Sequence, residues 1–216
     1  MPIITSIKLQ RKGKRFNIYL DGKFAFAVSA VALTKANLRI DQEISEKDIE
    51  RLRDKDFKEK LYNRALHFLS YRQRSEKEIR DYLNKKIASQ KTQKFAESTD
   101  KVVEEIIAKL KDQDLIDDRA FVDWWIEQRS RFRPKGRRAL WSELLRKGIK
   151  KEIIETSLVS EEKEFDLARK AAIKKVKSYK GLKPMEFRQK MAAFLSRRGF
   201  NWEVIKKVLD HAKRGS

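Results

Sequence analysis

Apolar and polar residues alternate with a period of two over residues 4–29, a pattern typical of β-strands. Lys12-Gly13-Lys14 and Asp21-Gly22 separate three such runs. An Asp-Gly pair between alternating runs favours a hairpin with a type I′ turn, because both central residues of that turn need a positive φ. The pattern therefore predicts a small three-stranded antiparallel sheet, which must pack on the helices that follow it because so small a sheet is marginally stable alone.

Beyond residue 30 the apolar spacing becomes helical. Ser45 is a predicted N-cap with the acidic Asp48 at the third helical position, and Ile44 and Ile49 can pack together across this helix start. The helix extends toward Leu69, and the polar residues 54–56 allow a break within it. Ser75 opens the next helix.

The C-terminal two-thirds of the chain repeats one pattern of helices. The segment Leu144–Ile149 (LLRKGI) recurs as Leu195–Phe200 (LSRRGF), each followed by a short apolar helix. Ile79, Leu83 and Lys86 match Leu140, Leu144 and Lys147. A unit of this size cannot bury its apolar face alone, so the copies are expected to stack.

The first copy departs from the pattern, because Ile87 replaces the glycine and residues 88–100 read as an inserted loop. The fold class expected is mainly α, with tandem three-helix repeats that form a curved modular array behind a small N-terminal antiparallel sheet. The expected boundaries are 1–58 for the sheet with a helix, and 59–118, 119–160 and 161–216 for the three repeats.

The charge of the chain indicates that the repeats bind a partner. Lysine and arginine total 53 against 32 acids, which gives a net charge of +21 and suits a polyanion such as nucleic acid or an acidic protein surface. The excess lies mostly in residues 119–216. The absence of cysteine excludes disulfides, thiolate metal sites and a cysteine nucleophile. No run approaches the roughly 20 apolar residues of a membrane span, so we expect a soluble, cytoplasmic protein without membrane association.

The densest basic cluster is Arg129–Arg138 (RSRFRPKGRR), with six cations and no acid at the junction of two predicted helices. Its arginines are suited to phosphates or carboxylates, since the planar guanidinium binds both in a bidentate manner. The alternative is a solvated surface that also caps a helix. Tyr71, Phe132 and Tyr179 lie beside cations at predicted helix ends. They can stack on bases, although packing between helices is the commoner role.

Catalytic signatures are missing from the sequence. Asp112, Asp114, Asp117 and Asp118 lack the glycine and glutamate of a calcium loop and are expected to cap a helix. The glycine-rich nucleotide loops, the Gly-x-Ser-x-Gly elbow and the His-Glu-x-x-His zinc motif are also missing. The chain is therefore expected to be a binding protein without a cofactor. A metal-dependent nuclease with scattered carboxylates is the alternative that spacing cannot test.

Three ordered motifs resemble a known family. Tyr71–Ile79 (YRQRSEKEI), Leu115–Phe121 (LIDDRAF) and Arg133–Arg138 (RPKGRR) are similar to signatures of the bacterial regulatory protein family RecX, in its longer Firmicutes-type members. The match covers essentially the whole chain and departs from the family only in the first repeat.

The resemblance implies a monomeric inhibitor of the recombinase RecA. Such a protein binds in the groove of the RecA filament on single-stranded DNA, suppresses ATP hydrolysis, strand exchange and coprotease activity, and promotes disassembly. A general DNA- or RNA-binding protein without a RecA target is the alternative that the charge alone supports. The residues expected to contact RecA or DNA are Arg72, Arg74, Arg129, Arg131, Arg133, Lys135, Arg137 and Arg138, followed by Arg146, Lys147, Arg197 and Arg198.

Overall fold

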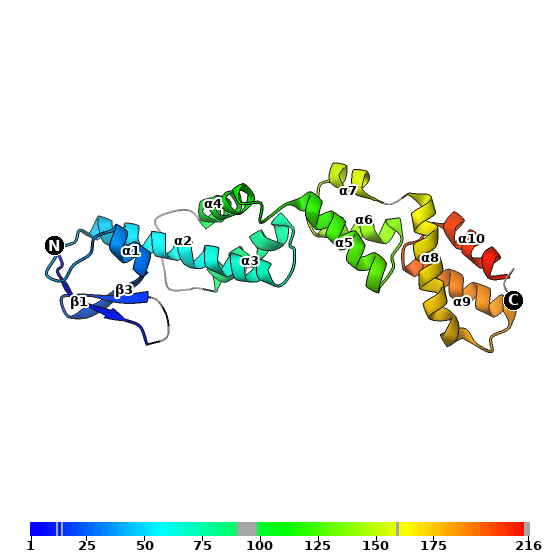
Figure 1. Cartoon of the computed structure of the whole chain (residues 1–216), viewed down its shortest axis with the longest axis horizontal. Coiled ribbons are helices and arrows are strands. Elements are labelled where there is room, and N and C mark those ends of the chain that lie inside the picture. Colours follow the sequence, from blue (N-terminus) through cyan, green and yellow to red (C-terminus); the bar gives the residue numbers. More distant parts are fainter. Residues whose placement is uncertain (12, 14, 90–98, 159, 214–216) are drawn as a thin grey trace. The chain divides into compact units, whose positions relative to one another are not determined.

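A computed structural model describes residues 1–11, 13, 15–89, 99–158 and 160–213 (Figure 1). The chain divides into two compact units. The first comprises Met1–Arg72 and Ile79–Gln113, and the second comprises Gln73–Glu78 and Asp114–Ser216.

The first unit begins with the predicted antiparallel sheet, whose strands β1 (Ile4–Leu9), β2 (Arg15–Leu20) and β3 (Lys23–Ser29) lie in sequence order. Asp21 and Gly22 form the turn between β2 and β3, with φ values of 47° and 80°. Both values are positive, as the Asp-Gly pair predicts. One face of the sheet is buried through Ile4, Ile18 and Val28, so the alternation of the sequence corresponds to a core side and a solvent side.

Two helices follow the sheet, α1 (Ala30–Lys35) and α2 (Glu46–Ser70). The Ser45 hydroxyl accepts a hydrogen bond from the Asp48 backbone nitrogen at 3.1 Å, which confirms the predicted cap. The break considered near residues 54–56 is wrong, because α2 is continuous there. Asp56, the last residue of this polar run, is buried.

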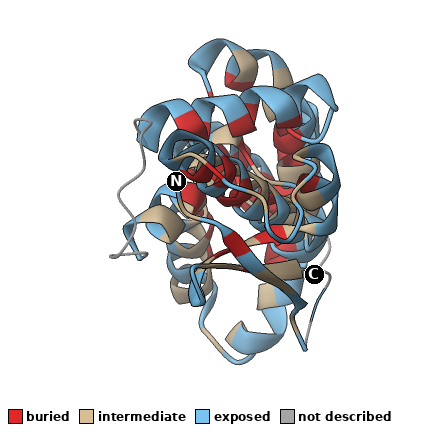
Figure 2. Cartoon of the chain, turned by 90° about the vertical axis from the view of Figure 1, so that its left-hand side faces the viewer, coloured by how far each residue is buried: buried red, intermediate tan, exposed pale blue. Residues whose placement is uncertain are grey.

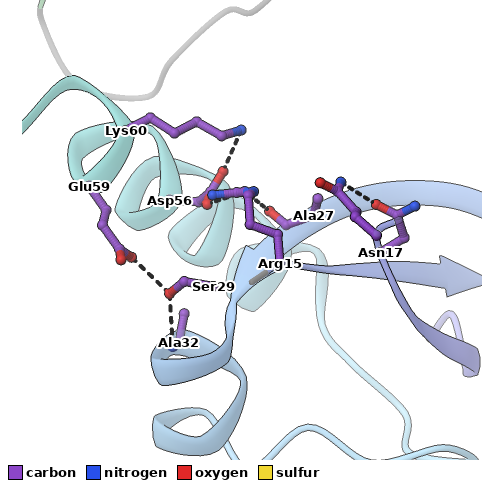
Figure 3. Close-up of polar contacts among 9 residues, drawn as sticks. Arg15, Asn17, Ala27, Ser29, Ala32, Asp56, Glu59 and Lys60 are labelled. Carbon is purple, nitrogen blue, oxygen red and sulfur yellow. Dashed lines mark hydrogen bonds and ion pairs between the residues drawn. The ribbon is translucent and has the colours of Figure 1, made fainter. Parts of the chain in front are cut away.

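Polar contacts join α2 to the sheet (Figure 3). The Asp56 carboxylate binds Arg15 of β2 and Lys60 one turn later in α2. Arg15 also donates to the Ala27 carbonyl on β3 at 2.9 Å. A buried carboxylate needs such partners, because an unpaired charge in the interior is costly. The pairing explains why α2 continues through the polar stretch.

The first unit is completed by α3 (Glu76–Ala88), whose start belongs to the second unit, and by α4 (Thr99–Asp112). Ile79 and Leu83 of α3 are buried, as are Val103, Ile107 and Leu110 of α4. The predicted inserted loop lies largely at residues 90–98, outside the described residues.

The second unit contains two further groups of three helices. The first group is α5 (Asp118–Phe132), α6 (Arg137–Arg146) and α7 (Lys151–Ser157). The second is α8 (Glu161–Val176), α9 (Pro184–Arg197) and α10 (Trp202–Lys213), with a short 3₁₀ turn at Lys177–Tyr179. Each group has its own apolar core. Buried positions lie on the sides of helices and strands that face one another, whereas the outer sides are exposed (Figure 2).

Glycines end α6 and α9 as predicted. Gly148 and Gly199 adopt φ values of 80° and 79°, the left-handed conformation that glycine allows without steric cost. The mainly helical fold with three-helix groups and a small N-terminal sheet is thus confirmed. Among the described helices, none has both the length and the apolar character that a bilayer crossing requires.

Candidate binding surface

Neighbouring three-helix groups in the second unit meet where one helix begins and another ends. The backbone nitrogens of Gly136 and Arg138, at the start of α6, donate to the carbonyl oxygens of Arg198 and Gly199, after α9, at 3.0 and 3.2 Å. A Cβ added to Gly136 would lie 2.3 Å from the Gly199 carbonyl oxygen. Only glycine therefore permits this approach of the two backbones. We call this contact the second joint.

A carboxylate completes the second joint. Glu164, in the first turn of α8, accepts a hydrogen bond from the Arg137 backbone nitrogen at 3.0 Å and is buried. Helix starts commonly bind anions through exposed N–H groups. Here the N–H groups of Gly136, Arg137 and Arg138 are all used within the protein. The basic cluster must therefore bind a partner through its side chains.

An equivalent contact, the first joint, forms at the start of α3. Asp118, in the first turn of α5, accepts a hydrogen bond from the Glu76 backbone nitrogen at 2.9 Å. Ser75 donates from its hydroxyl to the Lys147 carbonyl oxygen at 2.7 Å, and the Lys147 ammonium binds Glu78. The two joints thus use residues that the repeated sequence makes equivalent. In both, a carboxylate from the later group caps a helix of the earlier one.

The α5–α6 loop of the basic cluster is held by Glu143, a buried residue of α6. Its carboxylate accepts hydrogen bonds from Trp125 Nε1 at 3.0 Å, from Arg129 Nε at 2.9 Å and from Lys135 Nζ. Arg129 also lies over the Trp125 ring at 4.4 Å from its centroid. Glu143 therefore fixes the two ends of the loop against α6.

Burial raises the pKa of Glu143, but the hydrogen bonds from Lys135, Arg129 and Trp125 together outweigh this effect. The pKa of Glu143 is consequently below its ordinary value. The carboxylate is charged at neutral pH and offsets part of the positive charge of Arg129 and Lys135.

Arg198 extends across the second joint. Its guanidinium donates to the Pro134 carbonyl oxygen at 3.1 Å and lies 4.7 Å from the Phe194 ring centroid. Burial, and then repulsion from Arg133, lower the pKa of Arg198. An arginine stays protonated despite such a shift. Two cations from different three-helix groups therefore influence one another at this joint.

The predicted contact residues fall into three classes by their surroundings. Arg129, Lys135, Lys147 and Arg198 are half-buried and bound within the protein. Arg72 and Arg74 are half-buried in the segment before α3. The remaining residues are exposed and have no ion pair within the described part of the chain: Arg131, Arg133, Arg137, Arg138, Arg146 and Arg197.

Two of the aromatic residues near the cations are not packed between helices. Tyr71 and Phe132 are 70% and 66% exposed, so the packing expectation is wrong for them. Tyr71 follows α2 and contacts the neighbouring His67 ring, and Phe132 ends α5 and lies beside Arg131. Tyr179 does pack against the core of α8–α10. Trp125 lines the core of α5–α7, as do Trp124 and Trp141.

Sequence reasoning missed the acids that organise these cations. Glu143 is the only acidic residue between Glu127 and Glu152, and such an isolated acid in a basic stretch is the signal that was available. Glu164 carried no comparable signal, because its partner is a backbone nitrogen in another three-helix group.

Comparison with known proteins places these features in a family. The N-terminal domain model of the regulatory protein RecX matches residues 2–45, and the models of its first, second and third three-helix domains match residues 62–91, 117–158 and 161–209. The chain is 37% identical to the regulatory protein RecX of Bacillus velezensis over 99% of its length and 78% of that protein. It is also 37% identical to the Bacillus subtilis protein of that name, over 97% and 77%.

A crystal structure of regulatory protein RecX is also similar. It superposes with a TM-score of 0.68 at 31% identity, over 97% of this chain and 100% of the other. The structure of RecX from Lactobacillus salivarius gives a TM-score of 0.57 at 26% identity, over 71% and 95%.

Proposed function

The chain belongs to the RecX family of regulatory proteins, and from this premise we propose that it inhibits RecA by binding the RecA filament on single-stranded DNA. Binding in the filament groove suppresses ATP hydrolysis, strand exchange and coprotease activity and promotes disassembly. The protein acts as a monomer in the cytoplasm and performs no catalysis of its own.

The observation that carries this proposal is the position of the arginines at the second joint. Arg198, which follows α9, reaches the Pro134 carbonyl oxygen of the basic cluster, and Arg131, Arg133, Arg137 and Arg138 are exposed in that cluster. Guanidinium groups bind carboxylates and phosphates in a planar, bidentate manner. A filament groove offers both kinds of anion, from the recombinase and from the DNA.

General nucleic-acid binding is the second candidate function, and the net charge of +21 favours it. The two functions differ in their response to salt. Binding to bare DNA through phosphates weakens steeply as salt rises, because counterions are released. Recognition of a filament that presents RecA as well should be tighter and less dependent on salt.

The test measures the DNA-dependent ATPase of RecA as this protein is titrated at two salt concentrations. The variant R131E/R133E/R137E should lose inhibition while keeping the helical circular dichroism spectrum of the wild type. The control K163E/K170E/K174E changes the net charge equally on the exposed side of α8.

The outcomes separate the candidates. Loss of inhibition in the arginine variant alone supports the proposed surface. Equal loss in both variants means that total charge decides, which favours general nucleic-acid binding. Full inhibition by a folded arginine variant places the contact elsewhere on the molecule.

A further inference from the structure

A lysine-lined hollow lies in the first unit, where it is lined by residues of α1, α2 and α4. These three helices are labelled in Figure 1. Its volume is about 520 Å³. Four lysines line it, namely Lys35 of α1, Lys55 and Lys58 of α2, and Lys109 of α4. We call it the lysine groove.

The acids of the lysine groove are already bound. Glu59 accepts a hydrogen bond from the Ser29 hydroxyl at 2.9 Å, and Glu105 pairs with Lys58 at 2.7 Å (Figure 3 shows the first). Among the described residues, Lys35, Lys55 and Lys109 have no carboxylate partner. These three cations are therefore available to an external anion.

Lys109 has an aromatic contact instead of an acidic one. Its ammonium lies 4.1 Å from the centroid of the Tyr62 ring, which also lines the groove. A cation over an aromatic face is held weakly at an exposed site. An anion with a higher charge density can draw Lys109 away and leave the Tyr62 face open to a flat, apolar group.

The groove continues beyond this first hollow. A second hollow of about 400 Å³ is lined by the same Lys35 and Lys55, by Arg51 of α2, and by the acids Glu43 and Asp48. Arg51 is itself paired with Asp48 at 3.6 Å. The two hollows share these lysines and therefore adjoin beside α1 and α2. Such an arrangement fits a linear ligand better than a small molecule.

We infer that the lysine groove binds a strand of single-stranded nucleic acid through its phosphates. Lysine binds phosphate as a compact point charge, and several lysines along one depression can contact successive phosphates of a strand. Strand binders combine cations that follow the backbone with an aromatic face for a base, and Tyr62 provides that face here. The first unit thus has a nucleic-acid contact of its own, which requires no RecA.

The test measures binding of fluorescently labelled oligo-dT to the full chain, without RecA, by anisotropy over a series of salt concentrations. The variant K35E/K55E/K109E should bind on the order of tenfold or more weakly, and the slope of log affinity against log salt should fall by about two. The control K23E/K47E/K101E removes the same charge from exposed lysines of the first unit outside the groove. It should keep the wild-type slope.

A second measurement locates the strand, because charge reversal also acts at a distance. The chain has no cysteine, so N63C at the groove and N84C on the exposed side of α3 each carry a single benzophenone label. Illumination should crosslink oligo-dT to N63C and not to N84C. Equal binding by the two triple variants, or equal crosslinking at the two positions, overturns the inference. Neither result bears on RecA inhibition, which is measured separately.

Discussion

Glu164 caps the start of a helix that belongs to a different three-helix group, by accepting the Arg137 backbone N–H at 3.0 Å. The pairing of Asp118 with the Glu76 backbone nitrogen repeats the arrangement. Both hydrogen bonds are part-buried, and a typical hydrogen bond contributes roughly 0.5–1.5 kcal/mol, so these acids tie successive groups together.

Replacing Glu164 by alanine should therefore destabilise the protein by about 1 kcal/mol, because the part-buried Arg137 N–H loses its acceptor. Urea unfolding followed by circular dichroism gives this free energy. The matched change Glu161→Ala, at an exposed position in the same turn, should cost less than about 0.5 kcal/mol. Equal effects of the two variants would show that the cap contributes nothing.

Substitutions at two glycines with nearly the same backbone conformation can distinguish the cost of a steric clash from the cost of backbone strain. Gly199 and Gly181 have φ values of 79° and 85°. A Cβ at Gly199 would lie 2.4 Å from the Ala139 backbone nitrogen, whereas one at Gly181 meets nothing within 4 Å. Gly181→Ala should cost about 1–2 kcal/mol from strain alone. Gly199→Ala should cost roughly 1–3 kcal/mol more, because the second joint must open. Similar losses in thermal or urea unfolding would contradict this role of the joint.

The contribution of Glu143 to stability should depend on pH. Its pKa in the folded protein is lowered, so the contribution is fully present above the pKa of an unfolded glutamate, roughly 4.3, and is lost as pH falls through the lower folded value. Glu143→Gln should cost about 1–3 kcal/mol at pH 7, since it removes the charge that Arg129 and Lys135 bind. Urea unfolding of both proteins between pH 7 and 3 should show the difference shrinking at the acid end. A difference that stays constant with pH would exclude the charged carboxylate as its cause.

Exposed and internally bound cations of the predicted contact set should respond differently to loss of charge. Arg133→Gln should change the free energy of unfolding by less than about 0.5 kcal/mol, because the side chain is exposed. Lys147→Met should cost about 1–3 kcal/mol, because Glu78 then keeps a half-buried charge without its ammonium partner. Urea unfolding and the ATPase assay together distinguish the two kinds of residue. A contact residue should affect inhibition and not stability, whereas a structural residue should affect stability. Equal stability of the two variants would remove this distinction.

Local rules explain which parts of the fold the sequence predicts. The turn at Asp21-Gly22, the Ser45 cap and the helix ends at Gly148 and Gly199 each depend on a few neighbouring residues. The continuity of α2 was not predictable in this way, because Asp56 is stabilised by Arg15, which is far away in the sequence.

The residues of the candidate surface were predictable from the sequence, but the ion pairs among them were not. The run Arg129–Arg138 does lie at the junction of α5 and α6, as its pattern indicates. The sequence does not tell that Arg129 at the end of α5 and Lys135 in the following loop both bind Glu143 while Arg131 and Arg133 are exposed, because the pairing depends on how α6 packs against α5. The contact roles, the repeat boundaries and the curvature of the array stay predictions.

The direction of the two joints has a consequence for synthesis on the ribosome. The start of α3 is complete only after Asp118 and Lys147 have been made, and the start of α6 only after Glu164 and Gly199. In a nascent chain that has not reached residue 199, α5–α7 therefore lack the contacts at the start of α6. The groups that contain α3 and α6 must each wait for the next group to emerge before they reach full stability.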